Sequence, residues 1–225
     1  MPRRVADGVH LLDVGWPEPV GSNAYVVDDG DVTLVDTGLP IPRRSLSGEL
    51  RAAGFETADI DRVLLTHYDI DHVGGLGRLD VDVPVYLGAA DAELVRRSWS
   101  PPWRHHKGAF HRLVRRLFSL SSVDLRPVED GDEIGGFRAV HTPGHNPGHT
   151  VFLHEGSETA LLGDLVWESD RQFVSPPWLD SYDKEEIATS IGRVAEESFE
   201  HACVGHGTPL SPAADATLRA LAAEL

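Results

Sequence analysis

The chain has 225 residues, enough for one α/β domain with a well-buried core, and we predict a single domain over residues 1–225. Its 36 acidic residues against 20 basic ones give a formal net charge of −16, which argues against a nucleic acid as partner. Lys107 and Lys184 are the only lysines. An acidic chain so poor in lysine indicates adaptation to a salt-rich cytosol, with an ordinary acidic cytosolic protein as the alternative.

The N-terminal sequence predicts no export signal. Met1-Pro2-Arg3-Arg4 is not followed by an apolar stretch, and no segment approaches the roughly 20 apolar residues of a membrane span. We therefore expect a cytoplasmic protein without a membrane partner. The single cysteine, Cys203, excludes an intrachain disulfide and lies in an apolar run typical of core packing.

Apolar periodicity predicts the following elements in chain order. Strands over 9–14, 24–28 and 32–36 precede a helix over 43–53, which Gly54 ends. A strand over 62–66, a short helix from Val73, a strand over 83–87 and a helix from Ala90 lead into an irregular segment. Strands over 125–128, 137–141, 150–153 and 159–163 come next, then a helix over 184–197, a strand over 202–205 and a helix from Pro212. Two runs of strands with helices predict an α/β fold, an αββα sandwich of two mixed sheets.

The segment Thr66-His67-Tyr68-Asp69-Ile70-Asp71-His72 carries four potential metal ligands directly after an apolar strand. On an extended chain His67, Asp69 and Asp71 would point to one side, with His72 available once the chain turns at Gly74. Two histidines and two aspartates at a strand end would be costly to bury without cations. The segment therefore predicts a metal site.

Three later segments place further ligands at strand ends. They are Thr142-Pro143-Gly144-His145-Asn146-Pro147-Gly148-His149, Leu161-Leu162-Gly163-Asp164 and Val204-Gly205-His206-Gly207. Each follows a short apolar strand and contains Gly or Pro where the strand ends. We therefore expect several strand ends to converge on one edge of a sheet.

In order and spacing, these motifs together resemble the metallo-β-lactamase superfamily, specifically its glyoxalase II-like hydrolases. The resemblance covers nearly the whole chain and includes Asn23-Ala24-Tyr25-Val26-Val27 and Asp36-Thr37-Gly38. It implies the αββα sandwich and two divalent metal ions. His67, Asp69 and His145 would hold the first ion, Asp71, His72 and His206 the second, and Asp164 would bridge them.

The resemblance also implies a chemistry. A hydroxide shared by the two ions would attack the substrate, and Asp71 would orient it and pass a proton to the leaving group. Zinc is the expected metal, but Asp69 stands where most relatives have histidine. Its harder oxygen donor favours manganese or iron. Asp36 is expected to orient a ligand histidine, and His149 to pack beside the centre without binding metal.

We expect hydrolysis of an acyl ester, with a thioester favoured. Trp167 stands where homoserine-lactone hydrolases of the family carry tyrosine, and an indole cannot replace a phenolic donor, which disfavours a lactone. The alternatives are a phosphoester hydrolase, an iron-dependent enzyme of thiol or oxygen redox chemistry, as in the similar flavodiiron oxygen reductases, and a non-catalytic metal-binding protein.

A basic and aromatic segment interrupts the acidic chain at about residues 96–118. In one interpretation this basic segment forms a lid that recruits an anionic small-molecule substrate through Arg104, Lys107 and Arg112. In the other it is an amphipathic helical hairpin that packs on the body or forms a homo-oligomer interface. The sequence leaves both open.

Overall fold

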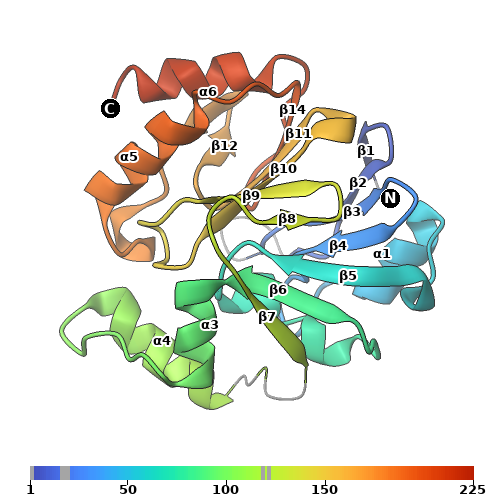
Figure 1. The fold of residues 1–225 in the computed structure, drawn as a ribbon, viewed down its shortest axis with the longest axis horizontal. Helices are drawn as coiled ribbons and strands as arrows, with labels where there is room; N and C mark the ends of the chain where they lie inside the picture. The colour runs from blue at the N-terminus through green and yellow to red at the C-terminus, as the bar shows by residue number, and fades with distance from the viewer. Residues whose placement is uncertain (1–2, 16–20, 118–119, 121–122) are drawn as a thin grey trace.

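The computed structural model describes residues 3–15, 21–117, 120 and 123–225, and its strands form two large sheets (Figure 1). Neighbours in the first sheet follow chain order: β1 (Arg3–Ala6), β2 (Val9–Leu12), β3 (Ala24–Asp28), β4 (Val32–Val35), β5 (Ile60–Leu65), β6 (Pro84–Gly88) and β7 (Asp124–Val128). Strands β1 to β4 pair antiparallel, and β4 to β7 pair parallel.

The second sheet comes from the C-terminal half of the chain. Its spatial order is β14 (His201–Val204), β11 (Thr159–Gly163), β10 (Thr150–His154), β9 (Phe137–His141) and β8 (Glu133–Ile134). Strand β14 pairs parallel with β11, and the other neighbours pair antiparallel. A separate two-stranded ribbon consists of β12 (Trp167–Ser169) and β13 (Gln172–Val174).

Helices cover the outer faces of both sheets (Figure 1). The first half contributes α1 (Leu46–Ala53), α2 (Ile70–Val73), α3 (Ala89–Arg96) and α4 (His106–Leu117), and the second half α5 (Lys184–Val194) and α6 (Ala214–Ala222). Short 3-10 turns are η1 (Thr57–Asp59), η2 (Leu76–Arg78), η3 (Glu155–Ser157) and η4 (Trp178–Asp180). None of the helices in the described part of the chain has the length and apolar character needed to cross a bilayer.

Side-chain alternation along the central strands builds three apolar layers. In β5, Leu64 packs between the two sheets, whereas its neighbours Val63 and Leu65 pack towards α1 and α3. In β10, Phe152 likewise packs between the sheets, and Val151 packs outwards with the residues of α5 and α6. Because successive strand residues point to opposite faces, each sheet is apolar on both sides. The predicted αββα sandwich is confirmed.

The structure differs from the prediction at several elements. Helix α2 begins at Ile70, so the extended alternation expected through Asp71 is wrong. Residues 106–117 form α4, where the chain-order pattern predicted an irregular segment and the second interpretation of the basic segment predicted a helical hairpin. Pro101 and Pro102 precede this helix rather than interrupt it, and a proline cannot disrupt the hydrogen bonds of a helix that starts after it. Strands β1 and β8 and the β12–β13 ribbon were not predicted. Residue 118, at the end of the basic segment, lies outside the described residues.

Phe152→Ala should lower the free energy of unfolding by about 3–5 kcal/mol, because it leaves a cavity between the two sheets. Phe152 is fully buried there. Urea denaturation followed by circular dichroism measures the change. Leu225→Ala, at the exposed C-terminus, is the control and should change stability by less than about 0.5 kcal/mol. A loss below about 1 kcal/mol for Phe152→Ala would contradict its placement in the inter-sheet core.

Candidate metal centre

The seven predicted ligands lie together where the ends of both sheets meet. His67, Asp69, Asp71 and His72 follow β5, His145 lies between β9 and β10, and Asp164 and His206 follow β11 and β14. The strands supply fixed anchors, and the loops after them carry the polar side chains. The convergence expected from the sequence is therefore present, at the junction of two sheets rather than at one edge.

The proposed first group is compact and buried. The Nε2 atom of His145 lies 3.2 Å from Nε2 of His67 and 3.1 Å from Oδ2 of Asp69. The His67 nitrogen is 3.4 Å from the same Asp69 oxygen. Ligand atoms about 2.0–2.1 Å from a tetrahedral zinc ion lie about 3.3 Å from one another. These three atoms therefore have the spacing of a metal-binding face.

The proposed second group lies beside the first. Oδ2 of Asp71 is 3.7 Å from Nε2 of His72 and 3.4 Å from Nε2 of His206. Asp164 lies between the groups: its Oδ1 is 3.4 Å from His72 Nε2, and its Oδ2 is 3.2 Å from His206 Nε2 and 3.6 Å from His145 Nε2. One carboxylate thus reaches both groups, as a bridging ligand must.

Asp36 orients two of the histidines. Its Oδ1 accepts a hydrogen bond from the Thr66 backbone N–H at 2.9 Å, and its Oδ2 lies 2.8 Å from both Thr66 Oγ1 and His72 Nδ1. His72 Nδ1 therefore carries a proton, which leaves Nε2 as a lone-pair donor. The Thr66 hydroxyl, donating to Asp36, accepts from His67 Nδ1 at 3.0 Å and fixes the same tautomer there. The contact expected between Asp36 and a candidate ligand histidine is present.

His149 supports Asp164 and does not face the metal groups with a free nitrogen. Its Nδ1 lies 2.8 Å from Thr142 Oγ1, and its Nε2 accepts the backbone N–H of Asp164 at 3.1 Å. Burial and the nearby His145 hold the pKa of His149 well below its ordinary value, so the ring stays neutral. The structure agrees with the packing role expected for this residue.

Sequence reasoning missed the residues that hold Asp69. Oδ1 of Asp69 accepts from His111 Nε2 at 2.6 Å and from Asn146 Nδ2 at 3.0 Å. Fully buried Asp91 lies behind them and accepts the backbone N–H groups of Tyr68 and Gly148, each at 2.8 Å. Asn146 stands inside the quoted His145–His149 motif, a signal that could have been weighed. His111 and Asp91 belong to no motif.

Helix α4 also places a lysine against the first group. Lys107 Nζ is 2.8 Å from both His145 Nε2 and Asp69 Oδ2, and it donates to the Asp180 carbonyl at 2.9 Å. The side chain is only 3% exposed. Burial alone would raise the pKa of Asp69, but the Lys107 ammonium and His67 outweigh it and hold that pKa well below its ordinary value.

The carboxylates around the second group favour a positive charge beside them. Burial would lower the pKa of His72, yet the carboxylates of Asp164, Asp36 and Asp71 raise it well above its ordinary value. Burial likewise opposes ionisation of Asp164, but His206 and His72 hold the pKa of this carboxyl well below its usual range. A divalent ion would supply the positive charge that these carboxylates stabilise.

Two unpartnered atoms and a glycine fit a bound ion. His72 Nε2 and Asp164 Oδ1 are buried, and neither has a hydrogen-bond partner in the described structure. Leaving buried polar atoms unpaired is costly, and an ion between them would satisfy both. Gly205 leaves room beside them, because a Cβ there would lie 1.8 Å from Asp164 Oδ1. The donor set and its surroundings therefore fit divalent metal.

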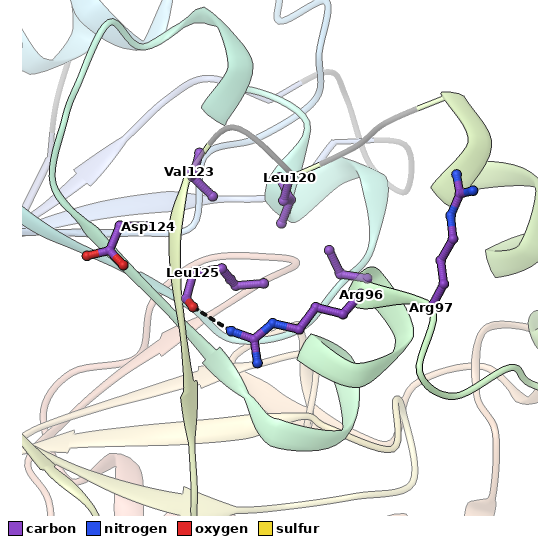
Figure 2. A pocket seen from close by; sticks show the side chains of 7 residues that line it. Arg96, Arg97, Leu120, Val123, Asp124 and Leu125 are labelled. Atoms are coloured by element: carbon purple, nitrogen blue, oxygen red, sulfur yellow. Dashed lines mark hydrogen bonds between the residues drawn. The ribbon is translucent and has the colours of Figure 1, made fainter.

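The arginines of the basic segment do not surround the metal groups. Arg112 Nε donates to the Pro101 carbonyl at 2.6 Å, and its guanidinium stacks on Trp103. Arg96 donates to the Leu125 carbonyl of β7 at 2.7 Å, in a separate pocket of about 530 Å³ that Arg97 also lines (Figure 2). Arg115 donates to the Trp99 carbonyl at 3.1 Å. These contacts fasten the basic segment to itself and to β7.

A cleft of about 600 Å³ opens over the metal groups. Asp69, Asp71 and His206 lie at its base, and His106 and Lys107 of α4 and Asp180 of η4 form polar parts of its wall. Its remaining lining is apolar and comes from five segments of the chain: Leu39, Ile70, Phe110, Trp167, Pro177 and Leu179. A concave, mostly apolar cleft with a few convergent polar groups is typical of small-molecule sites.

Gly205→Ala should lower metal content, because the added methyl group would collide with Asp164 and His72. We expect bound metal, measured by mass spectrometry of the purified protein, to fall by at least about half, as loss of one of two sites requires. Gly192→Ala is the matched control. It lies in α5, where an added Cβ meets none of the described atoms within 4 Å. Unchanged metal content in Gly205→Ala would contradict a ligand role for Asp164.

Comparisons with known proteins agree with this fold and site. The family model described as the metallo-beta-lactamase superfamily matches residues 17–215. The chain is 25% identical to the probable metallo-hydrolase YflN of Bacillus subtilis, over 92% of this chain and 86% of that protein. The metallo-beta-lactamase family protein TTHA1429 of Thermus thermophilus is 27% identical with a TM-score of 0.70, covering 97% of this chain and 79% of that one.

A second solved structure bears on the metal. The protein TTHA1623, crystallised in a di-iron-bound form, is 28% identical to this chain with a TM-score of 0.64, covering 86% of this chain and 91% of that one. The glyoxalase II-like subtype is not distinguished by these similarities. The match of the family model over most of the chain, the sandwich of two sheets and the His/Asp groups lead to one conclusion: the chain belongs to the metallo-beta-lactamase superfamily.

Proposed function

We propose that the protein is a binuclear metal-dependent hydrolase of acyl esters, with a thioester as the favoured substrate. The observation that carries this proposal is the convergence of seven candidate ligand side chains, three of which line an apolar cleft. Membership of a superfamily that includes the probable metallo-hydrolase YflN supports hydrolysis as the reaction class.

The chain's own residues have separate roles in this proposal. His67, Asp69 and His145 would hold the first ion, and Asp71, His72 and His206 the second, with Asp164 shared between them. Such a pair of ions lowers the pKa of bound water and polarises a carbonyl oxygen. Asp71 lines the cleft and is 18% exposed, so its carboxylate can reach a substrate and deliver a proton to the leaving group.

The cleft wall supports an uncharged acyl group over a phosphoester. Among the described residues that line it, Lys107 is the only Lys or Arg, and its ammonium already contacts Asp69, His145 and Asp180. The apolar wall would instead bury a hydrocarbon chain, a gain of about 0.8 kcal/mol for each CH₂ group. Since the recruiting arginines lie elsewhere, we propose a small molecule with an apolar acyl group.

The contacts of Trp167 support the prediction that a lactone is a disfavoured substrate. Its Nε1–H donates to Asp164 Oδ2 at 3.2 Å. An indole has one donor and no acceptor, so this donor is occupied and is not available to polarise a substrate carbonyl. The contact supports the view that Trp167 positions Asp164 and closes one side of the cleft.

The donor set accepts zinc, iron or manganese, and we propose zinc as the working metal. Histidine nitrogens and carboxylate oxygens are common zinc ligands. The oxygen of Asp69 in place of an imidazole, together with the di-iron form of TTHA1623, supports iron as the first alternative. Elemental analysis of protein purified without added metal distinguishes these ions.

Asp164→Ala should abolish hydrolysis of an acyl thioester and remove one or both ions while leaving the fold intact, because the carboxylate is shared by both groups. Thiol release measures turnover, mass spectrometry measures metal, and circular dichroism checks the fold. Asp82→Ala, an exposed position in the first half of the chain, is the control. Full metal content with near-native turnover in Asp164→Ala would refute the assignment, and turnover of phosphodiesters alone would refute the substrate class.

Leu179→Ala should lower kcat/KM for long-chain acyl thioesters by about five- to tenfold, with little change for acetyl thioesters. Leu179 lines the cleft, and its 69% exposed side chain would be covered by a long acyl chain. Leu113→Ala is the matched control, since Leu113 is also exposed on α4 but does not line the cleft. An equal effect on both chain lengths would argue against an acyl-binding wall at this position.

A further inference from the structure

Lys107 lies where the first metal ion would need its ligands. Its ammonium has four acceptor contacts: Asp69 Oδ2 and His145 Nε2 at 2.8 Å each, the Asp180 carbonyl at 2.9 Å, and Asp180 Oδ1 at 3.6 Å. A buried lysine is rare unless it is paired with a counter-charge. The contacts with Asp69 and Asp180 meet that requirement, so this burial is compensated and specific.

The ammonium and an ion would compete for the same lone pairs. An ammonium group has three donors and no acceptor, and an imidazole nitrogen has one lone pair. A His145 Nε2 that accepts a hydrogen bond from Lys107 therefore cannot donate that pair to a metal ion at the same time. Lys107 thus contacts two of the three ligand atoms of the first group.

Asp69 offers no second oxygen to resolve this competition. Its Oδ1 is occupied by His111 and Asn146. The remaining Oδ2 is the atom that faces His67 and His145, and it is also the atom that Lys107 contacts. Like charges at such short range repel strongly in a buried site, so an ion at the first group and the ammonium in this position would destabilise each other.

Asp71 and Asp164 differ from Asp69 in this respect. Within the described part of the chain, neither Asp71 nor Asp164 forms an ion pair with a lysine or arginine. His72 Nε2 and Asp164 Oδ1 lie 3.4 Å apart, and neither forms a hydrogen bond with a described residue. The internal cation at the first group is therefore a difference between the two groups.

The geometry points to Lys107 as a resident cation of the first site, which makes the two metal sites unequal. This inference rests on the proposed metal centre and deepens it. The second site fills first and tightly. An ion enters the first site only when the ammonium leaves Asp69 and His145. Asp180 lies at the cleft wall with a 44% exposed carboxylate, so the displaced ammonium keeps a counter-charge as it moves towards the cleft.

Zinc binding to the metal-free protein tests this inference. Titration by calorimetry with a competing chelator should give one tight ion for the wild type and a second held at least about tenfold more weakly. Lys107→Met should strengthen the weaker site by about tenfold or more, the scale on which partners of metal ligands alter affinity. Lys184→Met is the matched control, because the only other lysine contacts Ser175 and Pro176.

Two ligand variants identify the tight site. His206→Ala should lose the tight ion, and His145→Ala should retain it. The reverse pattern would overturn the inference. So would two ions of equal affinity in the wild type, or a weakened first site in Lys107→Met, while either outcome leaves the proposed hydrolase intact. Absence of zinc binding by the folded wild type would instead refute the metal centre itself. Lys107→Gln, which keeps a polar end, repeats the measurement if the methionine variant unfolds.

Discussion

The burial of carboxylates beside imidazoles is the constraint on which the site depends. Asp36, Asp69, Asp91 and Asp164 are all buried, each at 5% exposure or less. An unpaired charge in such surroundings is too costly to keep, so each carboxylate must receive donors or cations. Asp36 and Asp91 receive backbone N–H groups and side-chain donors, whereas the inner oxygens of Asp69 and Asp164 face ligand nitrogens. The first pair positions the centre, and the second pair is available to bind metal.

The two-sheet sandwich fixes the backbone segments that carry these carboxylates and imidazoles. Successive side chains of the strands that lead to the candidate ligands pack into apolar layers on opposite faces of each sheet. The backbone of each strand is therefore fixed on both faces up to the point where the candidate ligands begin. Asp36 then turns with a left-handed φ of 56°, an uncommon conformation for a residue other than glycine. That turn lets one carboxylate contact both Thr66 and His72, two segments of the chain about thirty positions further on.

The sequence was sufficient to predict the fold class and the placement of the proposed ligands, because the signals for both are local in the chain. Strand periodicity is a local signal. A candidate ligand next to Gly at a strand end can also be recognised from a few neighbouring residues, as Asp164 after Leu161-Leu162-Gly163 shows. The same reasoning identified Asp36 as a partner of a ligand histidine.

The pattern of apolar residues alone did not identify helix α4, although a helical hairpin was one of the two interpretations of its segment. Lys107 and His111 are polar residues on the buried face of a helix, so the apolar pattern that marks a helix is interrupted where the helix is most deeply buried. Their partners Asp69, His145 and Tyr182 lie far away in the chain. The arginines on the same segment suggested a surface for anions, but they fasten the segment by donating to backbone carbonyls of Pro101 and Trp99.

Asp69 and α4 form one unit, which gives the carboxylate at position 69 a structural role. A histidine at position 69 would remove the acceptor that His111 and Asn146 share, and it would place an imidazole rather than a carboxylate against the Lys107 ammonium. The His111 Nε2 donor would then lose its acceptor at a cost of about 1–3 kcal/mol, and the Lys107 ammonium would keep only Asp180 as a counter-charge. The carboxylate at this position, the lysine and the histidine of α4 are therefore mutually dependent. At the proposed first metal group, the positive charge of Lys107 on α4 offsets the negative charge of the Asp69 carboxylate.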